Sequence, residues 1–107
     1  MNDFDGVSVL VTGGSRGIGL AVSKAFAERG AKVTMMDILA DHAEEAMAAT
    51  GHPDNCRFVA GDVSDADSAA AAIDAAVEHG GGLDVLVNNA GITRDTLLMR
   101  MKDADWD

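Results

Sequence analysis

Short apolar runs alternate along the chain with segments whose apolar residues recur at helical spacing. The apolar runs are too short for helices, and the first of them leads directly into a glycine-rich turn. Runs of this kind are typical of strands in a parallel sheet, because both faces of such a sheet are buried. The predicted strands are Val7–Val11, Ala31–Met36, Arg57–Ala60 and Leu83–Val87.

The segments between these strands repeat apolar residues every three or four positions, as one face of a helix does. The predicted helices begin at Ile18, Asp41 and Ser64 and stop at Gly30, Gly51 and Gly80. Two of them are expected to open with a capping box, formed by Asp41 with Glu44 and by Ser64 with Asp67. The residues expected to face the core are Ile18, Val22, Ala25, Phe26 and Ala27, then Ala43, Ala46 and Met47, and finally Ala69, Ala72, Ile73, Ala76 and Val77.

Strands and helices in strict alternation, joined by short turns with glycine, indicate right-handed βαβ crossovers and a parallel sheet. The predicted fold class is therefore α/β. A chain of 107 residues provides for one small domain and no second one. The stretch from Asn89 is expected to be irregular as far as Asp103, where a further helix is predicted to begin.

The turn after the first predicted strand is Thr12-Gly13-Gly14-Ser15-Arg16-Gly17-Ile18-Gly19. Backbone amides at a helix N-terminus lack partners within the helix and attract anions. A mononucleotide phosphate loop requires a lysine where Leu20 stands, and the G-x-G-x-x-G spacing is not met either. The turn is followed by Asp37 at the end of the second strand, where a carboxylate can accept hydrogen bonds from an adenosine ribose. Together these features predict a dinucleotide-binding site.

With these residues in view, the sequence resembles the short-chain dehydrogenases/reductases. The resemblance rests on the TGGSRGIG turn, on Asp62-Val63 after the third strand and on Asn88-Asn89-Ala90-Gly91 after the fourth. The stretch GITRDTLLMRMKDADWD is most similar to the 3-oxoacyl-acyl-carrier-protein reductases, with acetoacetyl-CoA reductases a near second. The resemblance covers the N-terminal part of the family's fold. It implies that residues 1–107 are the dinucleotide-binding part of a Rossmann-type doubly wound sheet, truncated to about four strands in the order 3-2-1-4 with three helices.

The resemblance also implies roles for individual positions. Gly19 would let the first helix pack close to the strand, and Asp62 with Val63 would flank the adenine. Residues 89–91 would lie under the nicotinamide ribose, while Asn88 would help to hold the central strands together. The residues implied in cofactor binding are Gly13, Ser15, Arg16, Gly17, Ile18, Gly19, Asp37, Asp62, Val63, Asn89, Ala90 and Gly91.

Arg16 and Asp37 favour different cofactors. A carboxylate close to the 2′-phosphate of NADP repels it by several kcal/mol at an effective dielectric of about 20, so Asp37 favours NAD. Arg16 stands where its position resembles the basic site of NADP-using members, and the reductases that the sequence most resembles use NADPH. We expect NAD, with NADP as the alternative.

Charge and composition narrow the range of partners and compartments. A net charge of −10 disfavours nucleic acid and membrane surfaces. Cys56 is the single cysteine and is expected to pack at the start of the third strand, and no secretory signal opens the chain, so a cytoplasmic location is expected. His42, His52 and His79 share no ligand spacing and are expected at the surface rather than in a metal site.

The sequence contains no tyrosine, whereas the family exchanges a proton through a tyrosine assisted by lysine and serine. The resemblance therefore implies that the catalytic Ser, Tyr and Lys are absent and that this chain alone is inactive. A full-length form would reduce an acyl thioester or a small ketone by hydride transfer. The alternative is a non-catalytic nucleotide-binding or interaction module.

The predicted strand order would leave the fourth strand outermost, with unpaired backbone groups at Val85, Leu86 and Val87. Such an edge invites pairing. We therefore expect that the chain is marginally stable, that it associates through this edge as a homo-oligomer, or that it is a fragment of a longer polypeptide. The apolar residues Leu97, Leu98, Met99 and Met101 would serve packing, an oligomer contact or a substrate entrance.

Overall fold

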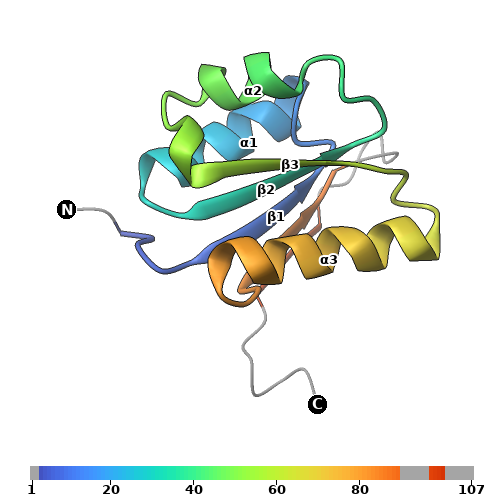
Figure 1. Ribbon diagram of the computed structural model, residues 1–107. Helices are drawn as coiled ribbons and strands as arrows, with labels where there is room; N and C mark the ends of the chain where they lie inside the picture. The colour runs from blue at the N-terminus through green and yellow to red at the C-terminus, as the bar shows by residue number, and fades with distance from the viewer. Residues whose placement is uncertain (1–2, 90–96, 101–107) are drawn as a thin grey trace.

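A five-stranded sheet with helices on both faces makes up the part of the chain that the computed structural model describes, residues 3–89 and 97–100 (Figure 1). The elements in chain order are β1 (Ser8–Thr12), α1 (Gly17–Glu28), β2 (Lys32–Asp37), α2 (Ala43–Ala49), the short 3-10 helix η1 (Pro53–Asn55), β3 (Cys56–Ala60), α3 (Ala66–Gly80), β4 (Val85–Asn88) and β5 (Leu97–Arg100). The four predicted strands and the three helices predicted between them are present, with boundaries that differ by at most two residues.

The sheet has the strand order β3-β2-β1-β4-β5. Strands β1 to β4 are parallel, which confirms the α/β class and the predicted order 3-2-1-4. The chain runs outward from β1 to β3 and then returns to place β4 on the other side of β1. The direction of winding therefore changes between β1 and β4. Ligands of open α/β sheets bind in the crevice outside the carboxyl ends of the strands at such a point.

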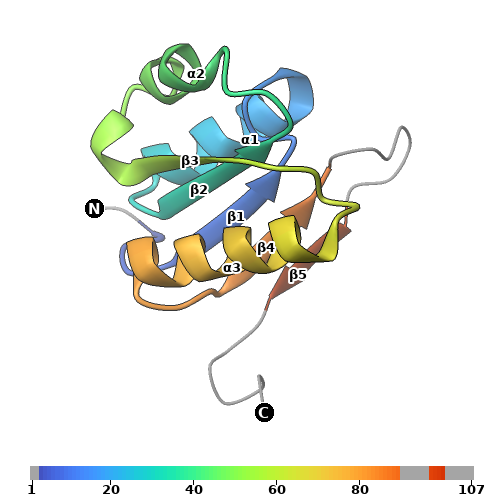
Figure 2. The ribbon, with the colours of Figure 1, turned by 45° about the vertical axis from the view of Figure 1, so that its right-hand side comes forward.

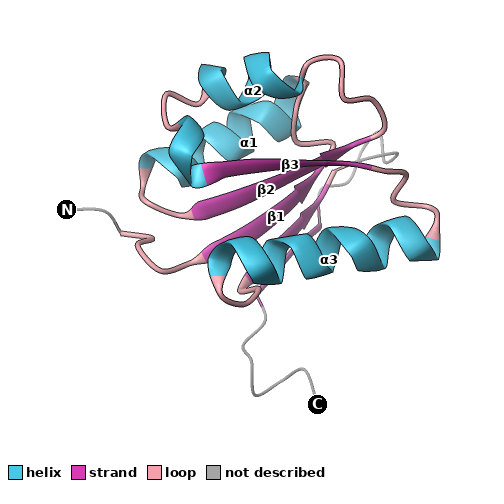
Figure 3. Cartoon of the chain, in the orientation of Figure 1, coloured by secondary structure: helices cyan, strands magenta, loops and turns pink. Residues whose placement is uncertain are grey.

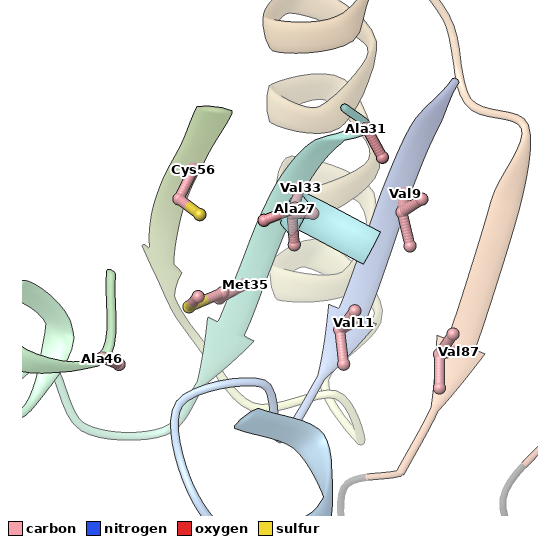
Figure 4. Close-up of a cluster of buried hydrophobic side chains, with 9 residues drawn as sticks. All are labelled: Val9, Val11, Ala27, Ala31, Val33, Met35, Ala46, Cys56 and Val87. Carbon is pink, nitrogen blue, oxygen red and sulfur yellow. The ribbon is translucent and has the colours of Figure 1, made fainter. Parts of the chain in front are cut away.

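The helices cover the two faces of the sheet unequally, with α1 and α2 on one face and α3 on the other (Figures 1 and 3). Successive side chains of a strand point to opposite faces, so each strand contributes to two clusters. The cluster beneath α1 and α2 contains Val9, Val11, Ala27, Ala31, Val33, Met35, Ala46, Cys56 and Val87 (Figure 4). The cluster beneath α3 contains Leu10, Met36, Ala72, Ala76 and Leu83. Burial of Cys56 in the first cluster confirms its predicted packing at the start of β3.

The predicted core faces of α1 and α3 are wrong in part. Ile18 is 68% exposed, Ala25 is exposed, and the buried residues of α1 are Gly19, Ser23 and Ala27. Helix α3 is buried against the sheet through Ala72 and Ala76. The following residue, Val77, points away from this contact and is 43% exposed. Small side chains allow close approach of helix and sheet. The fully buried positions of both helices are therefore small residues, while Val22, Phe26 and Ile73 pack partly buried against the core, as predicted.

Both predicted capping boxes are also wrong. The N-cap of α2 is His42, which makes no side-chain cap bond, instead of Asp41. The N-cap of α3 is Asp65, whose Oδ2 accepts from the Ser68 amide at 3.3 Å, instead of Ser64. The amide and hydroxyl of Ser64 both donate to Asp62 Oδ1, which holds Ser64 in a turn before the helix.

The expected bare edge of β4 is also wrong, because β5 pairs with β4 in antiparallel register (Figure 2). Strand β5 lies in the stretch that was expected to be irregular, and its pairing provides hydrogen-bond partners along the outer side of β4. A run of three apolar residues followed by Arg100 carries little strand signal of its own, so the neighbouring strand decides its conformation. The predicted helix from Asp103 lies outside the described residues.

The histidines take two kinds of surroundings. His42 and His52 are exposed, as predicted. His79 is partly buried, and its Nε2 lies 3.0 Å from the carbonyl oxygen of Asn55, so the surface prediction is only partly right for it. Within residues 3–89 and 97–100, no three side chains of the metal-ligating types cluster, and no helix has the length and apolar character to span a membrane.

Thr34 of β2 provides a test of the core beneath α3. It is fully buried, and its Oγ1 is the buried side-chain polar atom without a hydrogen-bond partner in the described part of the chain. An unpaired buried hydroxyl costs about 1–3 kcal/mol. We expect Thr34→Val to raise the free energy of unfolding by about 1 kcal/mol, measured by urea unfolding followed by circular dichroism.

Thr50→Val is the matched control. The buried hydroxyl of Thr50 donates to the Met47 carbonyl at 2.6 Å and accepts from the His52 amide at 3.1 Å. Its loss should lower the free energy of unfolding by about 1–2 kcal/mol. Equal losses at the two positions would contradict the unpaired state of the Thr34 hydroxyl.

Candidate functional site

A cleft of about 590 Å³ opens at the carboxyl ends of the parallel strands. Its volume lies in the range of about 300–1,000 Å³ that is usual for ligand pockets. The cleft is lined by Thr12, Gly13, Arg16, Gly17, Ile18, Met36, Asp37, Ile38, Gly61, Asp62, Val63, Ser64 and Asn89. It therefore lies where a doubly wound sheet is expected to bind a ligand.

Most residues predicted for the site line this cleft: Gly13, Arg16, Gly17, Ile18, Asp37, Asp62, Val63 and Asn89. Ser15 and Gly19 do not line it and are buried beside it. Ala90 and Gly91 lie outside the described residues. The fold thus brings together side chains from four separate turns of the chain.

The glycine-rich turn is attached to the end of β2. The amides of Gly13 and Gly14 donate to the carbonyl oxygen of Met36 at 2.7 and 3.2 Å. Both amides are therefore used in holding the turn and are not directed at a ligand. Gly17 starts α1 with φ +54°, a backbone conformation that favours glycine.

The start of α1 keeps its amides available to a ligand. Its N-cap is Arg16, an extended residue whose side chain makes no cap hydrogen bond. The first-turn amides of a helix have no acceptor inside the helix. Because Gly17 and Ile18 of this turn line the cleft, the positive end of the helix dipole faces the cleft.

Two glycines of the turn are required by close contacts. A Cβ on Gly19 would overlap the carbonyl oxygen of Gly13 and lie 3.1 Å from Asn89 Nδ2. A Cβ on Gly14 would lie 2.8 Å from the Val11 carbonyl oxygen and 3.1 Å from the Cβ of Met35. Gly19 thus packs against its own turn rather than against a strand, and Gly14 is a contact that the sequence analysis missed.

Asp37 is the most enclosed charged group of the cleft, with 6% of its surface exposed. Its Oδ2 accepts from the Ser15 hydroxyl at 2.5 Å. Its Oδ1 accepts from the amide of Ile38 at 3.0 Å and from Arg16 Nη2 at 3.3 Å. The carboxylate at the end of β2 is therefore held by the turn that follows β1.

These contacts determine the charge of Asp37. Burial is the largest single influence and by itself raises the pKa of this carboxyl group. The hydrogen bonds from Ser15, Ile38 and Arg16, together with the charge of Arg16, outweigh burial and hold the pKa of Asp37 below the ordinary 3.8. The carboxylate is consequently ionised at neutral pH, although it is almost fully enclosed.

Arg16 is the exposed partner in this pair. Its side chain is 62% exposed, and its 3.3 Å contact with Asp37 is long for a charged hydrogen bond. Exposed ion pairs hold little free energy, so the Arg16 side chain can move without large cost. An anion in the cleft could compete with Asp37 for it.

Asp62, at the turn after β3, is exposed and organised by its own loop. Its Oδ1 accepts from the amide of Ser64 at 2.9 Å and from the Ser64 hydroxyl at 2.7 Å. These hydrogen bonds lower the pKa of Asp62. Ser64, Ile38 and Gly61 line the cleft without having been predicted, because their place depends on how β2 and β3 end side by side.

Thr12 connects the two strands at the point where the winding direction changes. Its hydroxyl donates to Asn88 Oδ1 at 3.0 Å and accepts from the Asn89 amide at 2.8 Å. These bonds tie the end of β1 to the end of β4, which agrees with the strand-holding role expected of Asn88. They also bring Asn89 to the cleft. Thr12 was part of the predicted turn but was not predicted as a site residue.

Comparison with known proteins identifies relatives of this chain. A profile described as short chain dehydrogenase matches residues 7–107. The chain is 45% identical over 104 residues to the 3-oxoacyl-acyl-carrier-protein reductase FabG of Vibrio cholerae, covering 97% of this chain and 42% of that protein. It is 41% identical over 105 residues to the FabG of Thermotoga maritima, covering 97% and 43%. The chain thus spans about two fifths of the length of these relatives.

Solved structures give the same fold. The apo form of glucose dehydrogenase from Caenorhabditis elegans matches with a TM-score of 0.77 and 34% identity, over 86% of this chain and 40% of that one. The C-domain of a bacterial malonyl-CoA reductase with NADP matches with a TM-score of 0.76 and 33% identity, over 82% and 15%.

Gly19→Ala tests the close contact at the start of α1. At an ordinary helix position this change would stabilise by about 1 kcal/mol. We expect instead a loss of about 1–3 kcal/mol in the free energy of unfolding, because the new methyl group overlaps the Gly13 carbonyl. Urea unfolding provides the measurement.

Ala25→Gly, at an exposed position of the same helix, calibrates the helix propensity term and should cost about 1 kcal/mol. A gain in Gly19→Ala equal to the loss in Ala25→Gly would mean that the turn shifts freely and that the contact does not constrain it.

Proposed function

The chain belongs to the short chain dehydrogenase family, and we propose that its cleft binds the adenosine diphosphate part of a pyridine dinucleotide. The family resemblance seen in the sequence is confirmed by the matching profile and by the relatives named above. The observation that carries the proposal is the ionised, enclosed Asp37 carboxylate beside the uncapped start of α1. One group accepts hydrogen bonds from a sugar, and the other donates to a pyrophosphate.

The residues present fit such a ligand. The amides of Gly17 and Ile18 supply donors, and the N-cap side chain does not compete for them. Gly19 leaves no room for a side chain, so the turn stays close to the helix. A carboxylate that is ionised without a buried cation beside it suits a neutral, hydroxyl-bearing ligand.

In the proposed complex, Arg16, Gly17 and Ile18 hold the pyrophosphate at the first turn of α1. Gly13 lines the cleft beside it, and Gly19 keeps the turn in place. Asp37 accepts hydrogen bonds from the adenosine ribose. Asp62 and Val63 flank the adenine, and Asn89, Ala90 and Gly91 support the nicotinamide ribose. Ser15 contributes through Asp37, because it is buried beside the cleft.

A bound pyridine dinucleotide would supply the hydride for reduction of a carbonyl group. The names of the relatives support a 3-oxoacyl thioester as the substrate class, acted on in a protein of the relatives' length. The role that we propose for this chain is to bind and orient the nucleotide. The sequence has no tyrosine to exchange the proton, so we assign no catalytic residue to it.

We propose NAD as the preferred nucleotide and NADP as the alternative. Asp37 is ionised and enclosed, so it would repel a 2′-phosphate by several kcal/mol at an effective dielectric of about 20. Arg16 could leave Asp37 and offset part of this repulsion. The nucleotide named with the malonyl-CoA reductase domain supports the alternative.

Isothermal titration calorimetry of the purified chain with NADH and with NADPH tests the binding. We expect NADH to bind more tightly than NADPH. Asp37→Asn should weaken NADH binding by about tenfold and NADPH binding by less, since it removes a charged acceptor and a repulsion at once. Asp74→Asn makes the same charge change on the exposed face of α3 and should alter neither affinity. No heat with either nucleotide would contradict the proposal.

An activity assay tests the assignment of no catalytic residue. We expect the purified chain to oxidise NADH or NADPH no faster in the presence of an acetoacetyl thioester than buffer does. A rate that depends on the chain and on the thioester would overturn this assignment but would leave the nucleotide site standing.

A further inference from the structure

Ser15 differs from the other residues of the glycine-rich turn. Only 4% of its surface is exposed, and it does not line the cleft. Its hydroxyl group donates its single proton to Asp37 Oδ2 at 2.5 Å, and the two residues are 22 positions apart in the sequence. A hydroxyl in this state cannot donate to a ligand. If Ser15 affects the site, it acts through Asp37.

The three donors to Asp37 differ in how firmly they are held. The amide of Ile38 belongs to the backbone next to Asp37, and Ser15 is buried. Arg16 is 62% exposed and bonds at 3.3 Å. A ligand that approaches Asp37 can therefore displace Arg16, while Ser15 and Ile38 keep the carboxylate in place. Ser15 engages one oxygen and Ile38 the other, so together they define the rotation of the carboxylate plane.

The close approach of Ser15 to Asp37 is built into the turn. The amide of Gly14 donates to the Met36 carbonyl, which lies one residue before Asp37. A side chain at position 14 would meet the backbone of Val11 and the Cβ of Met35, so glycine is needed there. On the other side, the buried Ser23 hydroxyl donates to the Gly14 carbonyl at 3.2 Å. The turn is clamped from both sides next to Ser15.

We propose that Ser15 is a positioning residue that fixes the Asp37 carboxylate in the orientation that receives the two ribose hydroxyls, and so adds to the discrimination between a free 2′-hydroxyl and a 2′-phosphate. This inference rests on the proposed nucleotide site. The lowered pKa of Asp37 agrees with it, because the Ser15 hydrogen bond is the largest of the influences that favour the ionised form.

A purely structural Ser15 would have different consequences. Loss of its hydroxyl would then lower stability and weaken every nucleotide alike, whether or not position 37 carries a carboxylate. A positioning Ser15 affects NADH and NADPH unequally, and its effect disappears when Asp37 is replaced. The two roles are therefore separable by a double-mutant cycle.

The experiment measures NADH and NADPH dissociation constants for Ser15→Ala, Asp37→Asn and the double variant. We expect Ser15→Ala to weaken NADH by about five- to tenfold and to leave NADPH within about twofold. In the Asp37→Asn background the same change should alter NADH binding by less than about twofold. Ser15→Thr, which keeps the hydroxyl, should restore the preference, and Ser15→Cys, with its weak donor, should not.

Ser23→Ala is the matched control, since it removes a buried hydroxyl of α1 that bonds to the same turn without touching Asp37. It should change both affinities equally. An equal effect of Ser15→Ala on NADH and NADPH, or an undiminished effect in the Asp37→Asn background, would overturn the positioning role.

A measurement without nucleotide separates this inference from the proposed function. Carboxyl-carbon NMR titration of the ligand-free chain reports the pKa of Asp37 directly. Ser15→Ala should raise it, because the hydrogen bond that favours the ionised form is lost, whereas Ser23→Ala should leave it unchanged. A raised pKa without any nucleotide binding would show that Ser15 acts on Asp37, but it would overturn the proposed nucleotide site and with it the discrimination assigned to Ser15. An unchanged pKa together with tight NADH binding would sink only the role of Ser15.

Discussion

The hydrogen bonds between the turn after β1 and the end of β2 are the contacts on which the cleft depends. The amides of Gly13 and Gly14 are bound to Met36, and the hydroxyl of Ser15 is bound to Asp37. Without these bonds the turn would stand away from β2, and the start of α1 would not face the cleft. Glycine at positions 14 and 19 makes the approach sterically feasible, since a side chain at either position would meet backbone atoms. The site is thus a consequence of how closely two loops can pack.

Packing of α1 and the electrostatics of the cleft are linked. The helix buries Gly19, Ser23 and Ala27, and this orientation about the helix axis exposes Ile18 and brings the first-turn amides to the cleft. The same turn supplies the donors that keep Asp37 ionised despite its burial. A buried carboxylate is costly unless hydrogen bonds compensate for lost hydration. Here the compensation comes from neutral donors and one exposed cation, so the carboxylate retains its capacity for a further hydroxyl-bearing ligand.

At the β4 edge of the sheet, a neighbouring strand determines the conformation of a segment that has little strand signal of its own. Strand β5 pairs with β4 and extends the parallel sheet by an antiparallel strand. Thr12, Asn88 and Asn89 join β1 to β4 at the carboxyl ends, which connects this side of the sheet to the cleft. The hydrogen bonds of Thr12 therefore join β1 to β4 and also hold Asn89 in the wall of the cleft.

The sequence alone determined the order and type of the elements from β1 to β4 and their parallel arrangement. It also determined the glycine-rich turn and the place of Asp37 at the end of β2. They follow from local signals, namely the period of apolar residues and the residue types that turns require. The tertiary structure decided which face of α1 and α3 is buried, which residue caps each helix, that β5 covers the edge of β4, and that the Ser15 hydroxyl donates to Asp37. Each of these outcomes depends on which groups compete for one space or one hydrogen bond once the chain has folded. Ser15 and Asp37, for example, are 22 positions apart, and no local pattern records that they meet.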